Sequence, residues 1–269
     1  MTIKKTLTVA GSDSSGGAGL QADLKTFQEY GTFGFSAVTS IVTMDPDDNW
    51  RHDVTPIDAL VVKAALKTIL SGGPVDAMKT GMLGSVAIIE ETAAAIEQHH
   101  LQNVVIDPVM VCKGEDELMQ PENATAIRDL LLPLATVVTP NLFEASQLAG
   151  TAPITSLAEM KNAAVKIHQL GAQYVVIKGG KAIDSDKAID LLFDGTNYTL
   201  LEAPKDANNH NHGAGCTFAA AITAGLANGM TVEAAVSKAK DFVTAAITGG
   251  FALNEFIGPV WHGAYNRNN

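Results

Sequence analysis

Residues 6–31, TLTVAGSDSSGGAGLQADLKTFQEYG, hold the pattern that decides the fold class of this chain. A short apolar run comes first, then a glycine-rich loop, and then a stretch with the spacing of an amphipathic helix. An apolar run without alternation is typical of a strand that is buried on both faces of a sheet. The segment therefore predicts a buried strand, a loop and a helix, in that order.

The same order of strand and helix recurs along the rest of the chain. Further apolar runs of strand length lie at 35–43, 103–110, 136–140 and 174–180. Stretches with helical spacing lie between and after the strands, at 18–31, 57–72, 85–100, 123–135, 157–171, 214–228 and 232–248. Such alternation predicts a three-layer α/β fold, with a mainly parallel central sheet flanked by helices.

One segment breaks this alternation. Residues 190–204, DLLFDGTNYTLLEAP, contain two strand-like runs on either side of Asp194-Gly195, a pair that is common in hairpin turns. We therefore expect a hairpin that adds a small antiparallel edge to the sheet. Because no linker-like segment and no internal repeat interrupts the chain, residues 1–269 are expected to form one domain.

The composition narrows the functional classes. The chain has 269 residues and a formal net charge of −11, and its basic residues are scattered. Scattered basic charge argues against binding to nucleic acid or to an anionic membrane surface. The amino terminus lacks the apolar stretch of a secretory signal, and no segment has the roughly 18 apolar residues of a membrane span. We therefore expect a cytoplasmic protein that acts on small molecules.

The ends of the expected strands carry the candidate binding residues. In open α/β sheets, ligands bind in the crevice at the carboxyl ends of the strands. Small or polar residues stand at these ends, namely Gly11-Ser12-Asp13, Met44-Asp45, Lys79-Thr80-Gly81-Met82, Asp107-Pro108, Pro140-Asn141 and Lys178-Gly179-Gly180. We expect them to meet along one edge of the sheet and to surround a ligand.

The sequence His212-Gly213-Ala214-Gly215-Cys216 stands at the mouth of the Ala-rich helix that is expected at 214–228. Small residues let backbone N–H groups approach a ligand, and the positive end of the helix dipole points to the same place, so the segment has the features of an anion hole. A thiol in a first helical turn also has a lowered pKa. Two plainer alternatives stay open: a tight turn into a packed helix, and a Cys216 that is only a small packed residue.

Six motifs occur in an order that resembles a known family. They are AGSDSSGGAGLQADLKTF, KTGMLG, VIDPVM, TPNLFEA, IKGG and HGAGCTFAAA. In this order they resemble the ribokinase-like vitamin kinases, in the branch of the hydroxymethylpyrimidine (phosphate) kinases and the pyridoxal or pyridoxine kinases similar to them. The resemblance runs from about residue 6 to residue 263 and implies a central sheet flanked by helices. It also implies ATP-dependent phosphorylation of a hydroxymethyl group, and a homodimer.

The resemblance implies a catalytic role for the glycine-rich helix start. Cys216 occupies the place of the general base, where a thiol of lowered pKa would take the proton of the substrate hydroxyl. The N–H groups of Gly213, Ala214 and Gly215 would stabilise the charge on the transferring phosphoryl group. The nucleotide side of the site would be formed by Asn141, Glu144, Lys178, Gly180 and His212.

Mg²⁺ is the second cofactor that the resemblance implies beside ATP. Asn141 and Glu144 match an element of the family that places the ion, usually through water, and Asp107 is a second acidic contributor. Sparse carboxylates are enough, because Mg²⁺ keeps several of its waters. Lys178 would reach the phosphates as a point charge. Taken alone, Glu144 is also compatible with a solvated helix face, and Lys178 with a lysine at a strand end.

Met44 favours a B6 vitamer as the substrate. Many hydroxymethylpyrimidine kinases carry a glutamine at this place, whose amide can read the amino edge of the pyrimidine, and Met44 offers no such hydrogen bond. This points to pyridoxal, pyridoxine and pyridoxamine, with Asp23 and His52 on the polar groups of the ring and Met44 and Met82 as apolar walls. The full set of expected substrate contacts is Ser12, Asp23, Met44, His52, Gly81, Met82, Val109 and Cys112.

Cys112 lies in the charged loop that follows the Asp107 strand. Because pyridoxal has an aldehyde, a thiolate in such a loop can add to it reversibly as a hemithioacetal. We treat this as a hypothesis, and a small packed residue is the alternative.

Three other functions are weighed beside the B6 kinase. The first is the hydroxymethylpyrimidine kinase of thiamine synthesis, as the main or a side activity. The second is a vitamer- or nucleotide-binding protein without turnover, against which the intact Asp107, Glu144, Lys178 and Cys216 argue. The third is a cysteine hydrolase, which lacks a recognisable histidine partner motif. ATP-dependent incorporation of phosphate separates the kinases from the other two.

Overall fold

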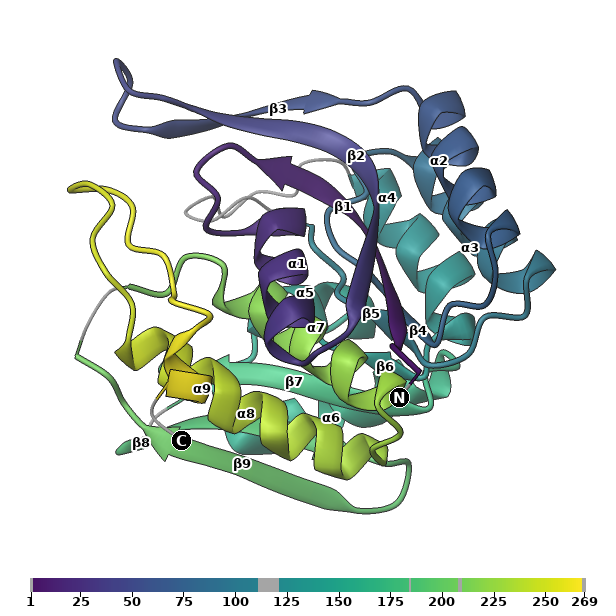
Figure 1. Ribbon diagram of the computed structural model, residues 1–269. Coiled ribbons are helices and arrows are strands. Elements are labelled where there is room, and N and C mark those ends of the chain that lie inside the picture. Colours follow the sequence, from purple (N-terminus) through teal and green to yellow (C-terminus); the bar gives the residue numbers. More distant parts are fainter. Residues whose placement is uncertain (1, 111–120, 184, 208–209, 268–269) are drawn as a thin grey trace.

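The computed structural model describes residues 2–110, 121–183, 185–207 and 210–267. In these residues one nine-stranded sheet runs through the molecule in the order β3-β2-β1-β4-β5-β6-β7-β8-β9 (Figure 1). The strands are β1 (Lys5–Asp13), β2 (Phe33–Asp45), β3 (Arg51–Pro56), β4 (Ala77–Thr80), β5 (Val104–Ile106), β6 (Val137–Val138), β7 (Tyr174–Gly180), β8 (Lys187–Phe193) and β9 (Tyr198–Pro204). The mixed α/β fold with a mainly parallel sheet is thus confirmed.

The antiparallel strands lie at the two edges of the sheet. Six neighbouring strands pair in parallel, in the order β2, β1, β4, β5, β6 and β7. At one edge β3 pairs with β2 in antiparallel fashion, and at the other edge the β8–β9 hairpin pairs with β7 in the same way. The hairpin predicted within 190–204 is therefore confirmed. The strand β3 was not predicted, because its sequence RHDVTP contains no apolar run.

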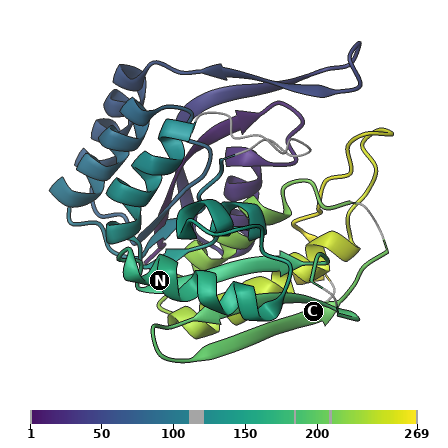
Figure 2. The same ribbon diagram turned by 180° about the vertical axis from the view of Figure 1, so that it is seen from behind.

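Helices cover both faces of the sheet. On one face lie α1 (Gly19–Glu29), α7 (Ala214–Ala227), α8 (Val232–Thr248) and the short α9 (Ala264–Arg267), which stand in front in Figure 1. The other face, turned forward in Figure 2, carries α2 (Ala59–Ser71), α3 (Val86–Gln98), α4 (Pro121–Ala126), α5 (Leu142–Ala149) and α6 (Leu157–Gln169). Three layers result, as the alternation of strands and helices predicts.

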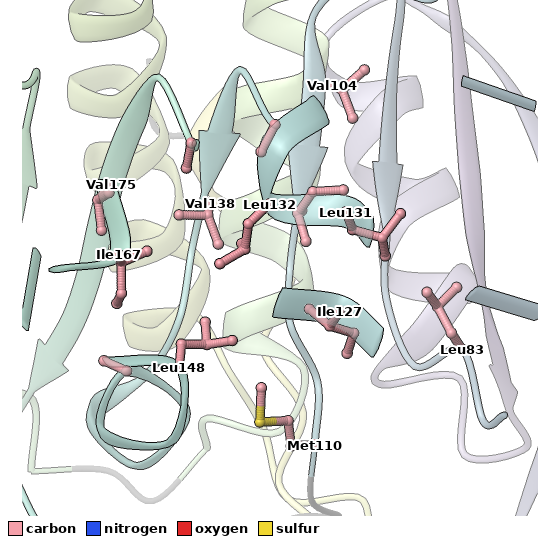
Figure 3. Packing of buried hydrophobic residues seen from close by; sticks show 14 of the residues in the cluster. Leu83, Val104, Met110, Ile127, Leu131, Leu132, Val138, Leu148, Ile167 and Val175 are labelled. Atoms are coloured by element: carbon pink, nitrogen blue, oxygen red, sulfur yellow. The ribbon is translucent and has the colours of Figure 1, made fainter. Parts of the chain in front are cut away.

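The central strands are buried on both faces, which explains their unbroken apolar sequences. In β5, Val104 and Ile106 belong to the core on the α2–α6 side, whereas Val105 belongs to the core under α7 and α8. Successive side chains of a strand point to opposite faces, so both cores need apolar residues. Figure 3 shows the first core, where Val138 and Val175 of the sheet lie near Ile167, Leu132 and Leu148 of the covering helices.

The helix expected at 123–135 is not a single helix. It consists of α4, a π-helical turn at Ile127–Leu131 and a 3₁₀ turn at Leu132–Leu134. Pro133 explains the break, because proline lacks the N–H that an α-helix needs and its ring clashes with the preceding turn. The short helices α5 and α9 were absent from the predicted set, and of the short strand β4 only the end, at Lys79-Thr80, was expected.

The expected strands at 103–110 and 136–140 are shorter in the structure. The paired residues are only Val104–Ile106 and Val137–Val138. Each run reaches a proline soon afterwards, at Pro108 and Pro140, and proline cannot donate a hydrogen bond to a neighbouring strand. In the described part of the chain, no helix has both the length and the apolar character required to cross a bilayer.

Candidate active site

A cleft of about 820 Å³ opens at the carboxyl ends of the parallel strands. Its lining includes fourteen of the residues that the sequence singled out for a site. These are His52, Gly81, Met82, Asp107, Val109, Asn141, Glu144, Lys178, Gly180, His212, Gly213, Ala214, Gly215 and Cys216. The strand ends therefore do meet around one cavity, because a parallel sheet brings all its carboxyl ends to the same edge.

The helix α7 begins in the wall of this cleft with a glycine that no other residue can replace without strain. Gly213 has a φ of +82°, and a Cβ built on it would lie 1.9 Å from the carbonyl oxygen of Gly17. Both the left-handed backbone and the contact thus require glycine. The turn packs the start of α7 against the glycine-rich loop between β1 and α1.

The amino terminus of α7 keeps free donors on the cleft side. No side chain caps it, and in the described residues the N–H groups of Gly213, Gly215 and Cys216 find no acceptor. Ala214 differs from the expectation, because its N–H donates to the carbonyl oxygen of Asn211 at 3.1 Å and so closes the turn. Free N–H groups at the positive end of a helix dipole attract an anion.

Lys178 adds a full positive charge at the same place. A Cβ built on Gly215 would lie 3.4 Å from the Lys178 Nζ, so the ammonium stands beside the start of α7. The same Nζ is 2.8 Å from the Asp107 Oδ1, which also accepts a hydrogen bond from the Thr139 hydroxyl at 3.2 Å. Lys178 is therefore fixed in position while it faces the cleft.

Glu144 is a buried carboxyl in the first turn of α5, within electrostatic reach of Lys178. It forms a capping box at the start of α5, in which its Oε2 accepts from the Asn141 N–H and the Asn141 Oδ1 accepts from the Glu144 N–H, both at 2.8 Å. Burial raises the pKa of Glu144 to about 7, against the lowering effect of Lys178, and the charge of Asp107 adds to the rise. Near neutral pH this group therefore changes its charge readily.

The thiol of Cys216 does not have the lowered pKa that its place in a first helical turn predicts. Burial raises its pKa to about 11; Lys79 opposes this rise, whereas the carboxylates of Asp23 and Asp107 add to it. The prediction from the helix dipole alone was wrong, because it ignored the loss of water around the sulfur and the two nearby negative charges. In the free protein the thiol is protonated at neutral pH.

A hydrogen-bonded histidine lines the cleft just before the start of α7. The His212 Nε2 is 2.7 Å from the Asp13 Oδ2 and 3.3 Å from the Ser15 hydroxyl. Burial by itself raises the pKa of Asp13, but the bonds from His212 and from the Ser15 N–H outweigh it and lower the pKa. The His52 ring, on β3, has its centroid 6.2 Å from that of His212. Asp13 was recognised only as a strand end and not as a site residue.

Three of the expected substrate contacts lie outside the lining. Asp23 is fully buried and its carboxylate accepts from the Lys79 Nζ at 2.8 Å and from the Thr8 hydroxyl at 2.6 Å. The expectation that it binds the substrate ring is therefore corrected: one turn into α1, the side chain faces the sheet rather than the cleft. The Ser12 hydroxyl is likewise held, by the Gln21 amide at 2.8 Å.

Met44 is the third of these residues and stays close to the site. It is the antiparallel partner of His52, so that the two side chains stand on the same face of the β2–β3 ribbon. His52 lines the cleft. Cys112 lies outside the described residues.

The far half of the cleft was not predicted from the sequence. There, Lys240 on α8 pairs with Asp190 on β8 at 2.7 Å, and the other oxygen of Asp190 accepts from the Gly180 N–H at 3.1 Å. Apolar lining residues surround this pair, namely Ala188, Ala203, Phe218, Val243 and Ile247. No local signal marks these residues, because they belong to separate elements that only the tertiary fold brings together.

Comparison with known proteins identifies the family. The sequence model of the phosphomethylpyrimidine kinase family matches residues 13–261, so the chain belongs to this family. A pyridoxine kinase of Bacillus subtilis (strain 168) is 55% identical over 268 residues, which cover 100% of this chain and 99% of the relative. A hydroxymethylpyrimidine/phosphomethylpyrimidine kinase of the same strain is 40% identical, covering 100% and 98% of the two chains.

A solved structure has the same fold over nearly the whole length. It is the pyridoxal kinase from Staphylococcus aureus in complex with AMP-PCP and pyridoxal, with a TM-score of 0.94 and 54% sequence identity. The match covers 99% of this chain and 96% of that one. The resemblance that the six motifs indicate is therefore confirmed.

Replacing Gly213 by alanine should lower the free energy of unfolding by more than the strain of a left-handed backbone alone explains. The matched control is Gly229→Ala, because Gly229 has a φ of +83° and an added Cβ would meet nothing within 4 Å. We expect the control to lose roughly 1–2 kcal/mol, the ordinary cost of a left-handed alanine. Gly213→Ala should lose clearly more, because the loop at Gly17 must move. Urea unfolding of both variants checks this, and equal losses would contradict the close packing.

Glu144→Gln should change how stability depends on pH. The folded state holds the proton of Glu144 up to about pH 7, whereas the unfolded chain releases it near 4.5. The wild type therefore loses stability from this group as the pH rises between these values, by about 1–3 kcal/mol. The glutamine variant lacks this loss, so its advantage over the wild type should grow from pH 4.5 to 7. Parallel curves of unfolding free energy against pH would contradict the assignment.

The matched control for this measurement is Glu159→Gln. Glu159 holds the same place in the capping box of α6 but is exposed, and hydrogen bonds from Thr155 lower its pKa. Its contribution to stability is thus present above the unfolded pKa of 4.5 and is lost as the pH falls, the opposite sign to that of Glu144.

Proposed function

We propose that this member of the phosphomethylpyrimidine kinase family transfers the γ-phosphoryl group of ATP to the 5′-hydroxymethyl group of pyridoxal, and also to that of pyridoxine and pyridoxamine. The product with pyridoxal is pyridoxal 5′-phosphate, as expected of a salvage enzyme. The observation that carries the proposal is the match over nearly the whole chain to a pyridoxal kinase solved with both AMP-PCP and pyridoxal. The cleft described above has room and polar groups for two ligands of these kinds.

The start of α7 and Lys178 are the groups proposed to stabilise the transferring phosphoryl group. The free N–H groups of Gly215 and Cys216 and the ammonium of Lys178 converge on the same part of the cleft. Negative charge spread over a phosphoryl group in transfer is stabilised by such preorganised donors, which cost no reorganisation during the reaction. Binding the nucleotide there leaves the half of the cleft near His212 for the acceptor.

Mg²⁺ fits the donor set beside Lys178. Asp107 and Glu144 are both buried carboxyls that line the cleft, and in the described residues no cluster of three or more acidic, histidine or cysteine side chains occurs. Two carboxylates together with phosphates and waters are what Mg²⁺ usually binds, and the ion neutralises charge on the phosphates when bound. We propose these two residues, with Asn141 orienting Glu144 through the capping box.

Cys216 is the residue proposed to take the proton of the acceptor hydroxyl. A pKa of about 11 means that the free protein holds the thiol protonated. The base role therefore requires that bound ligands change the charge around the sulfur in favour of the thiolate. Cys216 lines the same cleft as Gly215 and Gly81, where an acceptor hydroxyl would bind.

Residues of β2, β3 and β4 are proposed to surround the vitamer ring. Met82 and Val109 line the cleft as apolar walls, and His52 and the His212–Asp13 pair supply polar contacts. Met44 stands beside His52 and offers no amide to an aminopyrimidine. The pyrimidine kinase of thiamine synthesis is the alternative, since a hydroxymethylpyrimidine/phosphomethylpyrimidine kinase is 40% identical to this chain.

Relative rates on the two substrate types test this proposal. With Mg-ATP, we expect a higher kcat/KM for pyridoxal than for hydroxymethylpyrimidine. Met44→Gln should shift this ratio toward the pyrimidine by roughly tenfold, because a hydrogen bond to its amino edge is restored. Cys216→Ala should lower kcat by about 10²-fold or more, the usual effect of removing a general base. Preference for the pyrimidine in the wild type would assign the protein to thiamine synthesis instead.

We also propose that the protein acts in the cytoplasm as a homodimer. Apolar side chains of β2 and α2 are exposed, among them Ile41, Leu60 and Val61. Contiguous exposed apolar residues often mark an interface between subunits. Sedimentation equilibrium should return twice the mass of the chain, and Leu60→Asp should lower it toward the single chain. The mass of one chain for the wild type at micromolar concentration would rule out a stable dimer.

A further inference from the structure

Lys79 and Asp23 form an ion pair that is out of reach of solvent. The Lys79 Nζ is 2.8 Å from the Asp23 Oδ1, and both side chains are 0% exposed. Among the ion pairs of the described residues, no other has both partners fully buried. A buried pair loses much hydration energy, and apolar residues of similar size stabilise a fold equally well or better. Stability alone therefore does not explain this pair.

The ammonium of Lys79 lies directly under the floor of the cleft. Lys79 is the last residue but one of β4, and a Cβ built on Gly81, which lines the cleft, would lie 3.6 Å from its Nζ. Thr8 is the register partner of Lys79 on β1 and donates to the second oxygen of Asp23 at 2.6 Å. Three elements thus hold the ammonium in one position.

The same pair stands one helical turn away from the thiol of Cys216. Gly19, the first residue of α1, lines the same cleft as Cys216, and a Cβ built on Gly213 would lie 3.1 Å from the Cα of Ala18, so the start of α7 packs against the start of α1. Asp23 follows Gly19 by four residues, so its side chain lies on the same side of the helix, one turn further along. The helix α1 therefore places the thiol and the ion pair next to one another.

Four charged groups face this thiol from the surrounding elements. Lys79 from β4 and Lys178 from β7 are positive, while Asp23 from α1 and Asp107 after β5 are negative. Lys178 is already bound to Asp107 and faces the phosphate side of the cleft. Lys79 is the cation with the strongest favourable effect on a thiolate.

We propose that Lys79, fixed by Asp23 and Thr8, is the buried cation that makes a thiolate of Cys216 attainable during the reaction. Lys79 does not touch the substrate and is thus a positioning residue, acting through the charge of Cys216. Burial lowers the pKa of Lys79, but Asp23 and the other nearby anions outweigh this, so the lysine keeps its proton. The part of this inference that concerns the reaction rests on the proposed kinase function.

The ionisation of Cys216 can be measured without any substrate. Iodoacetamide reacts with the thiolate, so the rate of alkylation at a pH below the pKa falls tenfold for each unit by which the pKa rises. Peptide mass spectrometry follows Cys216 separately from Cys112. We expect Lys79→Met to slow the alkylation of Cys216 about tenfold or more between pH 8 and 9. Asp23→Asn should accelerate it, because the negative neighbour is gone.

Opposite changes of the alkylation rate in these two variants distinguish an effect of charge from an effect of loosened packing. If the pair were only structural, both variants would open the fold and both would accelerate alkylation. An unchanged or faster rate in Lys79→Met would overturn the proposal. The matched control is Lys240→Met, which breaks the Lys240–Asp190 pair on α8 and β8 and should leave the alkylation rate of Cys216 unchanged.

A double variant keeps the test valid if a single charge cannot be buried alone. Lys79→Met with Asp23→Leu replaces the pair by apolar residues, and alkylation should still be slower than in the wild type, because the ammonium that favours the thiolate is gone. The pH dependence of kcat/KM then connects the inference to the reaction: because the base must be deprotonated, Lys79→Met should shift the ascending limb to higher pH. If Lys79→Met slows alkylation as expected but the wild-type protein has no phosphorylation activity, the kinase function is contradicted, while the effect of Lys79 on the Cys216 thiol is still supported.

Discussion

The contact between the glycine-rich loop after β1 and the start of α7 is the constraint on which the rest of the site depends. Gly17 and Gly213 meet so closely that neither position has room for a side chain, and the Asp13–His212 hydrogen bond joins the same two segments. This contact fixes where α7 begins relative to the sheet. It therefore decides where the free N–H groups of the helix point and how far they stand from Lys178, because both sides of the anion site are attached to rigid elements.

Buried ion pairs lie in the cleft and beneath it. The lysine–aspartate pairs of Asp107 and Asp190 line the cleft, and the pair of Asp23 lies under its floor. Each pair crosses between different elements of the fold, and each lysine has donors left over for a neighbour. Keeping such groups ionised away from water costs stability, and each pair holds its lysine in a fixed position.

Burial also raises the pKa of the two groups in the cleft that can exchange protons. Glu144 and Cys216 both have a raised pKa, because water is withdrawn from each and carboxylates stand nearby. Both are thus held in their neutral forms more strongly than in water. Positive charge that arrives with a ligand favours the ionised form of each, so that the state of the site is linked to its occupation.

The sequence by itself determined the layer architecture, the antiparallel hairpin and fourteen residues of the cleft lining. Unbroken apolar runs can be satisfied only by strands buried on both faces, and the order of the chain then brings their polar ends, such as Asp107 and Lys178, to one edge. What only the tertiary structure decided is the direction of particular side chains and the water around them. Asp23 turns toward Lys79 rather than the cleft, Cys216 loses its solvent, and Lys240 meets Asp190 across 50 residues. Local pattern cannot specify these features, because burial and charge at one residue depend on elements that are distant in sequence.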